Sequence, residues 1–172
     1  MTLFLVGYMG CGKSVVGSKL AKVLGYEFVD LDTFIEEKEG QSILKIFKNK
    51  GEIYFRKIEN KYLNQVINFD NTVISLGGGT PCYGNNMNLM LKAENALVVY
   101  LKTSIQILVD RLFTEKSKRP LISHLELKSD LTEFIGKHLF ERAPYYEQSS
   151  YIIKTNELTV DGVVDHIILK LF

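Results

Sequence analysis

The chain has 172 residues, of which 46% are hydrophobic and 24% charged, and its formal net charge is +1 at pH 7. A chain of this length suits one compact domain, so we expect residues 1–172 to form a single unit with its own core. A net charge near zero creates no long-range attraction for nucleic acid or for an anionic membrane, and we expect neither as a partner. Any specificity for anions must therefore come from the local placement of lysine and arginine.

Location and assembly are inferred from what the sequence lacks. No stretch approaches the roughly 18 apolar residues of a membrane span, and the apolar start at residues 1–6 is too short for a signal peptide. The cysteines, Cys11 and Cys82, form neither a metal-ligand spacing nor a disulfide framework, which favours a reducing compartment. We therefore expect a cytoplasmic protein, and the absence of an evident apolar seam makes a monomer the simplest expectation.

The secondary structure follows from hydrophobic periodicity. Short apolar runs predict buried strands at residues 3–6, 27–30, 72–76, 96–101 and 151–153. Apolar residues recur at helical spacing between these strands, in segments 16–24, 43–47, 55–66, 105–112, 131–142 and 160–171. Gly25 suits a helix end, and Ser42 suits a helix start.

Strands that are apolar throughout and alternate with helices indicate a parallel sheet covered on both faces. We therefore predict a three-layer α/β/α fold with a central sheet of five parallel strands, counting the strand segments above. Right-handed crossovers bring the carboxyl ends of the strands to one edge of such a sheet. Gly7, Asp30 and the Gly77 triplet are expected to meet at that edge.

The segment Gly7-Tyr8-Met9-Gly10-Cys11-Gly12-Lys13-Ser14 matches the phosphate-loop pattern G-x-x-x-x-G-K-[ST]. Glycines let the backbone curl around an anion and present its N–H groups, and the next helix points the positive end of its dipole at the same anion. Lys13 supplies a full charge to the phosphates, and the Ser14 hydroxyl ligates Mg²⁺. The alternative is an ordinary glycine-rich turn. The apolar strand before the motif and the amphipathic helix after it favour nucleotide binding at Gly10, Cys11, Gly12, Lys13, Ser14 and Val15.

Two carboxylates follow the second strand. Alternate residues of an extended segment face the same side, so we expect Asp30 and Asp32 to point the same way. One would organise the magnesium shell while the other accepts a hydroxyl proton. The alternative is a turn at the strand end in which an aspartate caps a helix before Thr33.

The class of phosphate-loop protein follows from what accompanies the loop. A GTPase switch requires Asn-Lys-x-Asp, and the nearest string, Asn49-Lys50-Gly51-Glu52, lacks the aspartate. A motor or transport ATPase requires an apolar strand that ends in aspartate, and neither segment 73–76 nor segment 97–101 does so. The acids after the second strand favour a small-molecule kinase.

Six motifs occur together between the start of the chain and about Tyr146. They are residues 7–14, the pair Asp30 and Asp32, Phe55-Arg56 with Glu59, Gly77-Gly78-Gly79, Arg119-Pro120-Leu121, and Glu141-Arg142-Ala143-Pro144 followed by Tyr145. In this combination, order and spacing the chain resembles the shikimate kinase family. The resemblance implies a phosphate-loop kinase fold like that of nucleoside monophosphate kinases, with a substrate-binding helical segment at about 32–62 and a lid at about 113–126. It also implies ATP-dependent, Mg²⁺-assisted phosphorylation of the 3-hydroxyl of shikimate.

The resemblance assigns roles to individual residues. It implies that Asp32 contacts the substrate hydroxyls and acts as base, that Asp30 organises the metal through water, and that Ser14 ligates it. Arg56 and Arg142 would grip the substrate carboxylate, a task for which planar guanidinium groups are better suited than lysine. The loop Gly77, Gly78 and Gly79 would lie against the shikimate ring. Lys13 and Arg119 would neutralise charge on the phosphates.

Several alternatives stay open at this stage. Arg142 could be a surface residue paired with Glu141 or Glu147, and Arg56 could form a helix-surface pair with Glu59. The glycine triplet could be a flexible loop, and segment 114–120 a solvated one. Cys11 stands where the family commonly has serine or alanine, which leaves backbone binding intact and offers a target for thiol reagents.

Rival functions also remain. A kinase for gluconate or a nucleoside monophosphate would share the loop and the lid but would lack the combination of Arg56, the Gly77 triplet and Arg142. A non-catalytic nucleotide-sensing module would have no reason to keep Lys13 and Asp32 together with Ser14 and Arg119.

Overall fold

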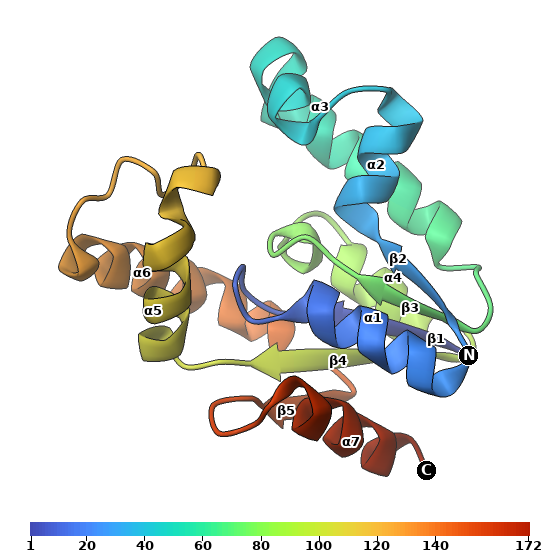
Figure 1. The fold of residues 1–172 in the computed structure, drawn as a ribbon. Coiled ribbons are helices and arrows are strands. Elements are labelled where there is room, and N and C mark those ends of the chain that lie inside the picture. The colour runs from blue at the N-terminus through green and yellow to red at the C-terminus, as the bar shows by residue number, and fades with distance from the viewer.

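A parallel five-stranded sheet forms the centre of the structure, a computed structural model that describes residues 1–172 except for the side chain of Lys118 (Figure 1). The strands lie in the order β2-β3-β1-β4-β5, and every pair of neighbours is parallel. Their bounds are β1 (Thr2–Val6), β2 (Glu27–Asp30), β3 (Thr72–Ser75), β4 (Ala96–Lys102) and β5 (Tyr151–Lys154). The strands predicted from the sequence are confirmed, with ends that differ by a residue.

Helices cover both faces of this sheet. In chain order they are α1 (Lys13–Leu24), α2 (Leu31–Glu39), α3 (Ile43–Val66), α4 (Asn86–Lys92), α5 (Ile105–Glu115), α6 (Lys128–Tyr146) and α7 (Val160–Leu171), with short 3₁₀ turns η1 (Thr80–Cys82) and η2 (Lys116–Lys118). Among the residues described, no helix is both long and apolar enough to cross a membrane.

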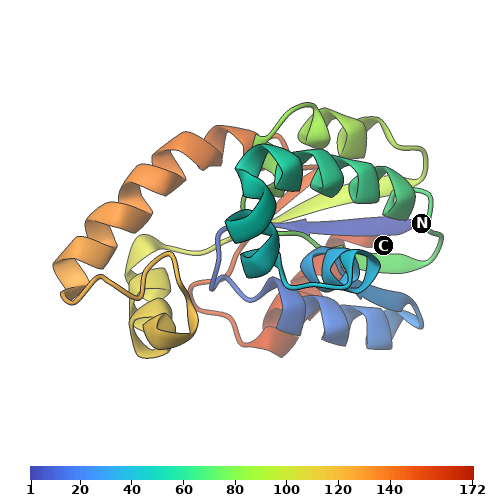
Figure 2. The ribbon, with the colours of Figure 1, turned by 90° about the horizontal axis from the view of Figure 1, so that it is seen from above.

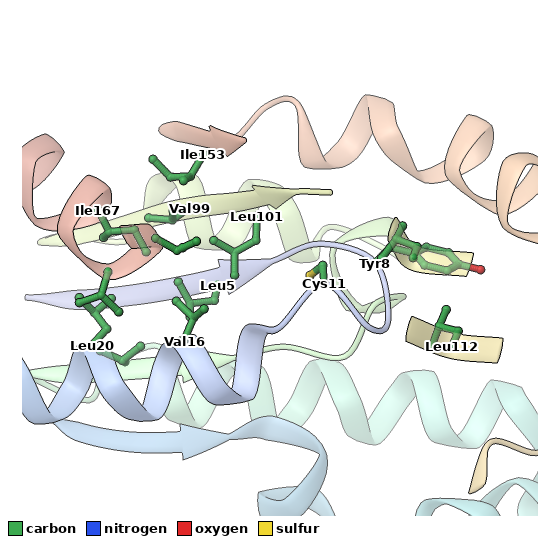
Figure 3. Packing of buried hydrophobic residues seen from close by; sticks show 14 of the residues in the cluster. Leu5, Tyr8, Cys11, Val16, Leu20, Val99, Leu101, Leu112, Ile153 and Ile167 are labelled. Carbon is green, nitrogen blue, oxygen red and sulfur yellow. The ribbon is translucent and has the colours of Figure 1, made fainter. Parts of the chain in front are cut away.

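The central strand β1 divides the core into two layers because its side chains alternate between the faces of the sheet. Leu3 and Leu5 pack with α1 and α7, and Figure 3 shows Leu5 above Val16 and Leu20 of α1. Phe4 and Val6 pack on the opposite face with α3 and α4. The predicted three-layer α/β/α fold is therefore confirmed.

The segment after β2 differs from the prediction. The strand ends at Asp30, and Asp32 lies in the first turn of α2, so the prediction that the two aspartates share one side of an extended segment is wrong. Asp30 instead caps α2, since its Oδ1 accepts hydrogen bonds from the backbone N–H groups of Asp32 (3.1 Å) and Thr33 (3.3 Å). A capping aspartate was the alternative interpretation, and Asp30 is that cap.

Other helix limits agree with the sequence pattern. Gly25 ends α1 in the left-handed conformation, and the Ser42 side chain caps α3 by accepting a hydrogen bond from the N–H of Lys45 at 3.3 Å. The two helices predicted at 43–47 and 55–66 form one element, α3, broken at Gly51 (φ 80°, ψ 173°). Sequence periodicity missed α2, η1 and α4.

Two groups of elements extend beyond the carboxyl edge of the sheet. Figure 1 shows α2 and α3 rising on one side, while α5, η2 and the loop before α6 lie on the other. Figure 2 shows α6 running outward from the sheet toward this loop. The segments predicted to bind substrate and to form a lid therefore lie on opposite sides of the carboxyl edge.

The packing of α1 against the sheet gives a stability prediction. A Cβ atom at Gly17 would lie 2.6 Å from Cε2 of Phe28 and 3.1 Å from Cδ1 of Leu5. We expect Gly17→Ala to lower the free energy of unfolding by about 1–2 kcal/mol, because overpacking outweighs the gain in helix propensity. Urea unfolding measures this change.

Gly136 provides the matched control, since it also lies within a helix but a Cβ atom there meets nothing within 4 Å. Gly136→Ala should raise the free energy of unfolding by up to about 1 kcal/mol. Equal effects at the two glycines would contradict this account of the packing.

Candidate active site

The phosphate loop connects β1 to α1 at the centre of the carboxyl edge. The two fixed glycines of the motif, Gly7 (φ 145°) and Gly12 (φ 101°), have positive backbone φ angles that other residues rarely adopt, and so does Gly10 (φ 81°) at a variable position. Lys13 is 9% exposed, and its ammonium group donates hydrogen bonds to the carbonyl oxygens of Gly7 (2.8 Å) and Tyr8 (3.1 Å). The loop therefore curls around a single buried cation.

A cavity of about 560 Å³ opens in front of this loop. The residues predicted to bind nucleotide all line it, as do Asp30, Asp32, Gly77, Gly78 and Arg119. Gly79, Arg56 and Arg142 lie outside this lining. Sequence reasoning missed several lining residues, namely Ser75, Arg111, Val160 and Val163, while Thr114 of the lining lies in the predicted lid.

Three side chains bring oxygen atoms together beside the loop and form a donor set suited to a hard cation. The Ser14 hydroxyl donates to Oδ2 of Asp30 at 2.8 Å and lies 3.4 Å from the hydroxyl of Ser75. Oxygen ligands are those that Mg²⁺ prefers, and Mg²⁺ usually completes its shell with water and phosphate. Among the described residues, no three His, Cys, Asp or Glu side chains are grouped so that they could hold a metal ion. Sequence reasoning did not single out Ser75. The available signal is a polar residue at the carboxyl end of a strand, since Ser75 ends β3, which lies beside β1.

Asp32 is the carboxylate whose surroundings change its chemistry most. Burial raises its pKa to about 6, and the charges of Asp30 and Glu59 add to this effect while Lys13 opposes it. A Cβ atom at Gly77 would lie 3.0 Å from Oδ1 of Asp32, so the carboxylate faces the glycine loop at the cavity wall.

Arg56 is held by a buried partner. Its Nη1 donates to Oε2 of Glu59 at 2.9 Å, and Glu59 is 1% exposed. The hydroxyl of Thr80 donates to the other oxygen of Glu59 at 2.6 Å. The predicted pair of Arg56 with Glu59 is present, but it is not a pair on the helix surface, because Glu59 is buried where α3 meets η1. Burial works to lower the pKa of Arg56, and the charge and hydrogen bond of Glu59 outweigh it, so that the pKa is raised.

The glycine triplet passes between the two arginines. A Cβ atom at Gly79 would lie 3.1 Å from Nη2 of Arg56, and one at Gly78 would lie 3.6 Å from Nη1 of Arg142. The hydroxyl of Tyr146 donates to the carbonyl oxygen of Gly78 and ties the loop to α6. A side chain at Gly79 would therefore crowd the Arg56 guanidinium, which is a spatial reason for glycine there beyond flexibility, whereas a Cβ atom at Gly78 would meet Arg142 at an ordinary packing distance.

Arg142 lies half-buried on α6, with its guanidinium carbon 5.6 Å from the ring centre of Tyr8. The described side chains include no carboxylate within ion-pair distance of Arg142, and Glu147 pairs with Lys102 at 2.8 Å instead. The alternative of a surface pair with Glu141 or Glu147 is therefore wrong. Within the described part of the chain, the guanidinium has no carboxylate partner beside the glycine loop.

Arg119 follows η2 and lines the cavity from the side opposite α2. Its Nη2 pairs with Glu115 at 3.1 Å, whereas its Nε is buried and has no hydrogen-bond partner among the described atoms. The surrounding segment is not a freely solvated loop, since Ile122 is fully buried and Lys116 donates to the carbonyl oxygen of Leu125 at 3.0 Å.

Cys11 lies on the inner side of the phosphate loop. Its side chain is 3% exposed and packs in the core that contains Leu5 and Leu101 (Figure 3). The expectation that this thiol offers a target for reagents does not fit such burial, because attack requires contact with solvent.

The comparisons with known proteins give the family. The family model described as shikimate kinase matches residues 9–172. This chain belongs to the shikimate kinase family. A shikimate kinase of Flavobacterium johnsoniae is 44% identical over 167 residues, which cover 96% of each chain. A second, from Flavobacterium psychrophilum, is 41% identical over 99% of this chain and 98% of its own. ATP-dependent phosphorylation of shikimate is the activity of this family.

Solved structures agree with this assignment. The crystal structure of shikimate kinase from Bacteroides thetaiotaomicron superimposes with a TM-score of 0.91 at 34% identity, covering 99% of this chain and 98% of that one. The Acinetobacter baumannii enzyme, solved in complex with shikimate, gives a TM-score of 0.87 at 33% identity, with 99% and 92% covered. Deoxyadenosine kinase from M. mycoides, at 21% identity and a TM-score of 0.61, shares the fold alone.

The raised pKa of Asp32 generates a prediction about stability. The folded-state pKa of about 6 exceeds the ordinary value of 3.8, so the fold disfavours the ionised carboxylate. Stability is therefore lost through this effect as the pH rises from 3.8 through about 6. We expect Asp32→Asn to raise the free energy of unfolding near neutral pH by about 1–3 kcal/mol, with the gain vanishing toward pH ~4.

Urea unfolding at several pH values measures the effect, with the exposed Asp165→Asn as control. Asp165→Asn should change stability by less than about 0.5 kcal/mol at every pH. An Asp32→Asn variant that is less stable than the parent near neutral pH would contradict the assigned environment.

Proposed function

We propose that this chain transfers the γ-phosphate of ATP to the 3-hydroxyl of shikimate, with the ring carboxylate held by Arg56 and Arg142. One observation carries the proposal: the two guanidinium groups flank the glycine loop at the sheet edge where the phosphate loop and Asp32 line the cavity. Arginine binds a carboxylate through a planar, bidentate set of N–H groups. A small anionic alcohol docked there would present a hydroxyl to Asp32 and to the nucleotide.

The nucleotide end of the site uses backbone more than side chains. The N–H groups of residues 10–15 and the start of α1 would hold the β- and γ-phosphates, and Lys13 would exchange its contacts with Gly7 and Tyr8 for phosphate oxygens. Leu158 and Val160 provide apolar surface at the far end of the cavity for the adenine ring. Ser14 and Asp30 would hold Mg²⁺, which would supply positive charge beside the phosphates when bound.

Asp32 would orient the acceptor hydroxyl and take its proton. Its pKa of about 6 keeps the carboxylate mostly ionised at neutral pH while making it a stronger base than an ordinary aspartate. Asp32 lies half-buried beside Gly77, so a bound acceptor would displace water there, which favours transfer to the acceptor over hydrolysis. Transfer is then direct and in line, without a covalent enzyme intermediate.

Arg119 would stabilise negative charge as the phosphoryl group moves. Its buried Nε, without a hydrogen-bond partner among the described atoms, supports an anion at this position. Residues 113–126 would act as the lid that closes over ATP. Segment 32–62, which carries Asp32 and Arg56, would bind the acid from the opposite wall.

The remaining proposals concern context. Cys11 and Cys82 are free thiols, which supports a reducing compartment such as the cytoplasm. The net charge of +1 supports a small-molecule substrate rather than nucleic acid or membrane as partner. We propose a monomer, since one chain supplies every residue of the proposed site.

A coupled ADP-release assay with Mg²⁺ and ATP tests this function, with shikimate, gluconate, a nucleoside monophosphate or no acceptor. Of these four conditions, we expect ADP release only when shikimate is the acceptor. Arg142→Ala should raise the KM for shikimate by about 100-fold, because a buried charge pair with substrate is worth about 2–5 kcal/mol. Lys13→Ala should abolish turnover.

Lys137→Ala is the matched control, since Lys137 lies on the same helix but is 71% exposed and pairs with Glu133. It should leave both kinetic constants within about twofold. Activity with gluconate or a nucleoside monophosphate, but none with shikimate, would overturn the assignment of shikimate as the acceptor. ATP binding without turnover on any acceptor would favour a nucleotide sensor.

A further inference from the structure

Arg56 has a contact that its predicted role does not explain. Its guanidinium carbon lies 3.7 Å from the ring centre of Tyr83, so the planar group stacks on the tyrosine face. Arginine stacks on aromatic faces because the ring carries negative charge density there. Tyr83 immediately follows η1 and lies at the end of the segment that begins with the glycine triplet.

A second contact fixes the tyrosine ring. The hydroxyl of Tyr83 donates to Oε1 of Glu52 at 2.9 Å, and the same oxygen lies 3.4 Å from Nε and 3.4 Å from Nη2 of Arg56. Glu52 follows Gly51, where α3 is broken. The tyrosine is thus held at its hydroxyl by α3 and covers the guanidinium with its ring.

Each side of Arg56 has a distinct neighbour. Glu59 accepts from Nη1, Tyr83 covers one face, and the Nη2 edge approaches Gly79, where a Cβ atom would lie 3.1 Å away. The contact with Glu52 is longer and more exposed than the one with Glu59, since the side chain of Glu52 is 54% exposed and that of Glu59 is 1% exposed. A substrate carboxylate arriving along the glycine loop would therefore meet an edge that Glu52 holds only weakly.

We propose that Tyr83 is a positioning residue that sets the affinity for the acid substrate by fixing the plane of the Arg56 guanidinium. Without the ring, Arg56 keeps its bond to Glu59 and its longer contacts with Glu52, but it loses the surface that fixes the plane of the fork that grips a carboxylate. The inference rests on the proposed role of Arg56 in carboxylate binding. It adds a specificity determinant from the loop after the glycine triplet.

Steady-state kinetics with shikimate and with ATP test the proposal in Tyr83→Leu and Tyr83→Phe. Tyr83→Leu should raise the KM for shikimate by about tenfold, as expected for loss of a partly desolvated cation–π contact, with kcat and the KM for ATP within about twofold. Tyr83→Phe keeps the stacked ring and loses only the hydroxyl, so it should raise the KM by about threefold or less.

Phe69→Leu is the matched control, because Phe69 and Tyr83 are each 37% exposed and Phe69 lies before β3, away from the carboxyl edge. It should leave the KM for shikimate within about twofold. An unchanged KM in Tyr83→Leu, or an equal loss in Tyr83→Leu and Tyr83→Phe, would overturn the proposal. Parallel changes in kcat and in the KM for ATP would do the same, since they indicate a general structural effect.

A double-mutant cycle separates this inference from the function on which it rests. In an Arg56→Ala background, Tyr83→Leu should add less than about twofold to the KM, because the ring then has no guanidinium to position. A raised KM in Arg56→Ala with independent, additive effects of Tyr83→Leu would overturn the role of Tyr83 alone. An unchanged KM in Arg56→Ala would instead overturn carboxylate binding by Arg56.

Discussion

The burial of β1 on both faces is the constraint on which the rest of the structure depends. Leu3, Phe4, Leu5 and Val6 have no exposed surface, so the strand needs a helical layer on each side and neighbours along both edges. Parallel pairing to β3 and β4 satisfies its backbone and places the ends of all three strands together. The phosphate loop leaves β1 at that point, and the glycine triplet follows the end of β3 beside it. The geometry of the candidate site thus follows from the packing of one hydrophobic strand.

Polar groups at this edge are arranged in two sets with different surroundings. Around the phosphate loop, backbone N–H groups and the hydroxyls of Ser14 and Ser75 suit phosphate and a hard cation. Around the glycine triplet, two arginines approach from α3 and α6, and buried Glu59 anchors one of them. Asp32 lies at the cavity wall between these sets, where burial and neighbouring carboxylates raise its pKa to about 6. Nucleotide and acid are therefore expected to bind by different physical means at the two ends of one site.

Much of this arrangement could be predicted from the sequence. Apolar runs and helical periodicity predicted the strands and the three layers, because burial on both faces leaves a strong local signal. The fixed glycines and Lys13 predicted the phosphate loop, and the pairing of Arg56 with Glu59 was predicted from their spacing. The prediction for Asp30 and Asp32 was wrong because alternation holds only inside a strand, and the chain turns into α2 at Asp30. Ser75, Arg111 and Tyr83 were missed because their contacts are made across the fold, and no local pattern carries that information. The burial of Cys11 is likewise a property of tertiary packing.

The most direct test of the account is the position of the transferred phosphate. Phosphorus–proton coupling in the NMR spectrum of the product made from shikimate and ATP reports which ring carbon carries the phosphate. We expect a single product coupled to the proton on carbon 3, since in the proposed site two arginines would fix the carboxylate and one hydroxyl would face Asp32. Phosphate on another hydroxyl, a mixture of products, or release of inorganic phosphate without a phosphorylated acid would contradict it.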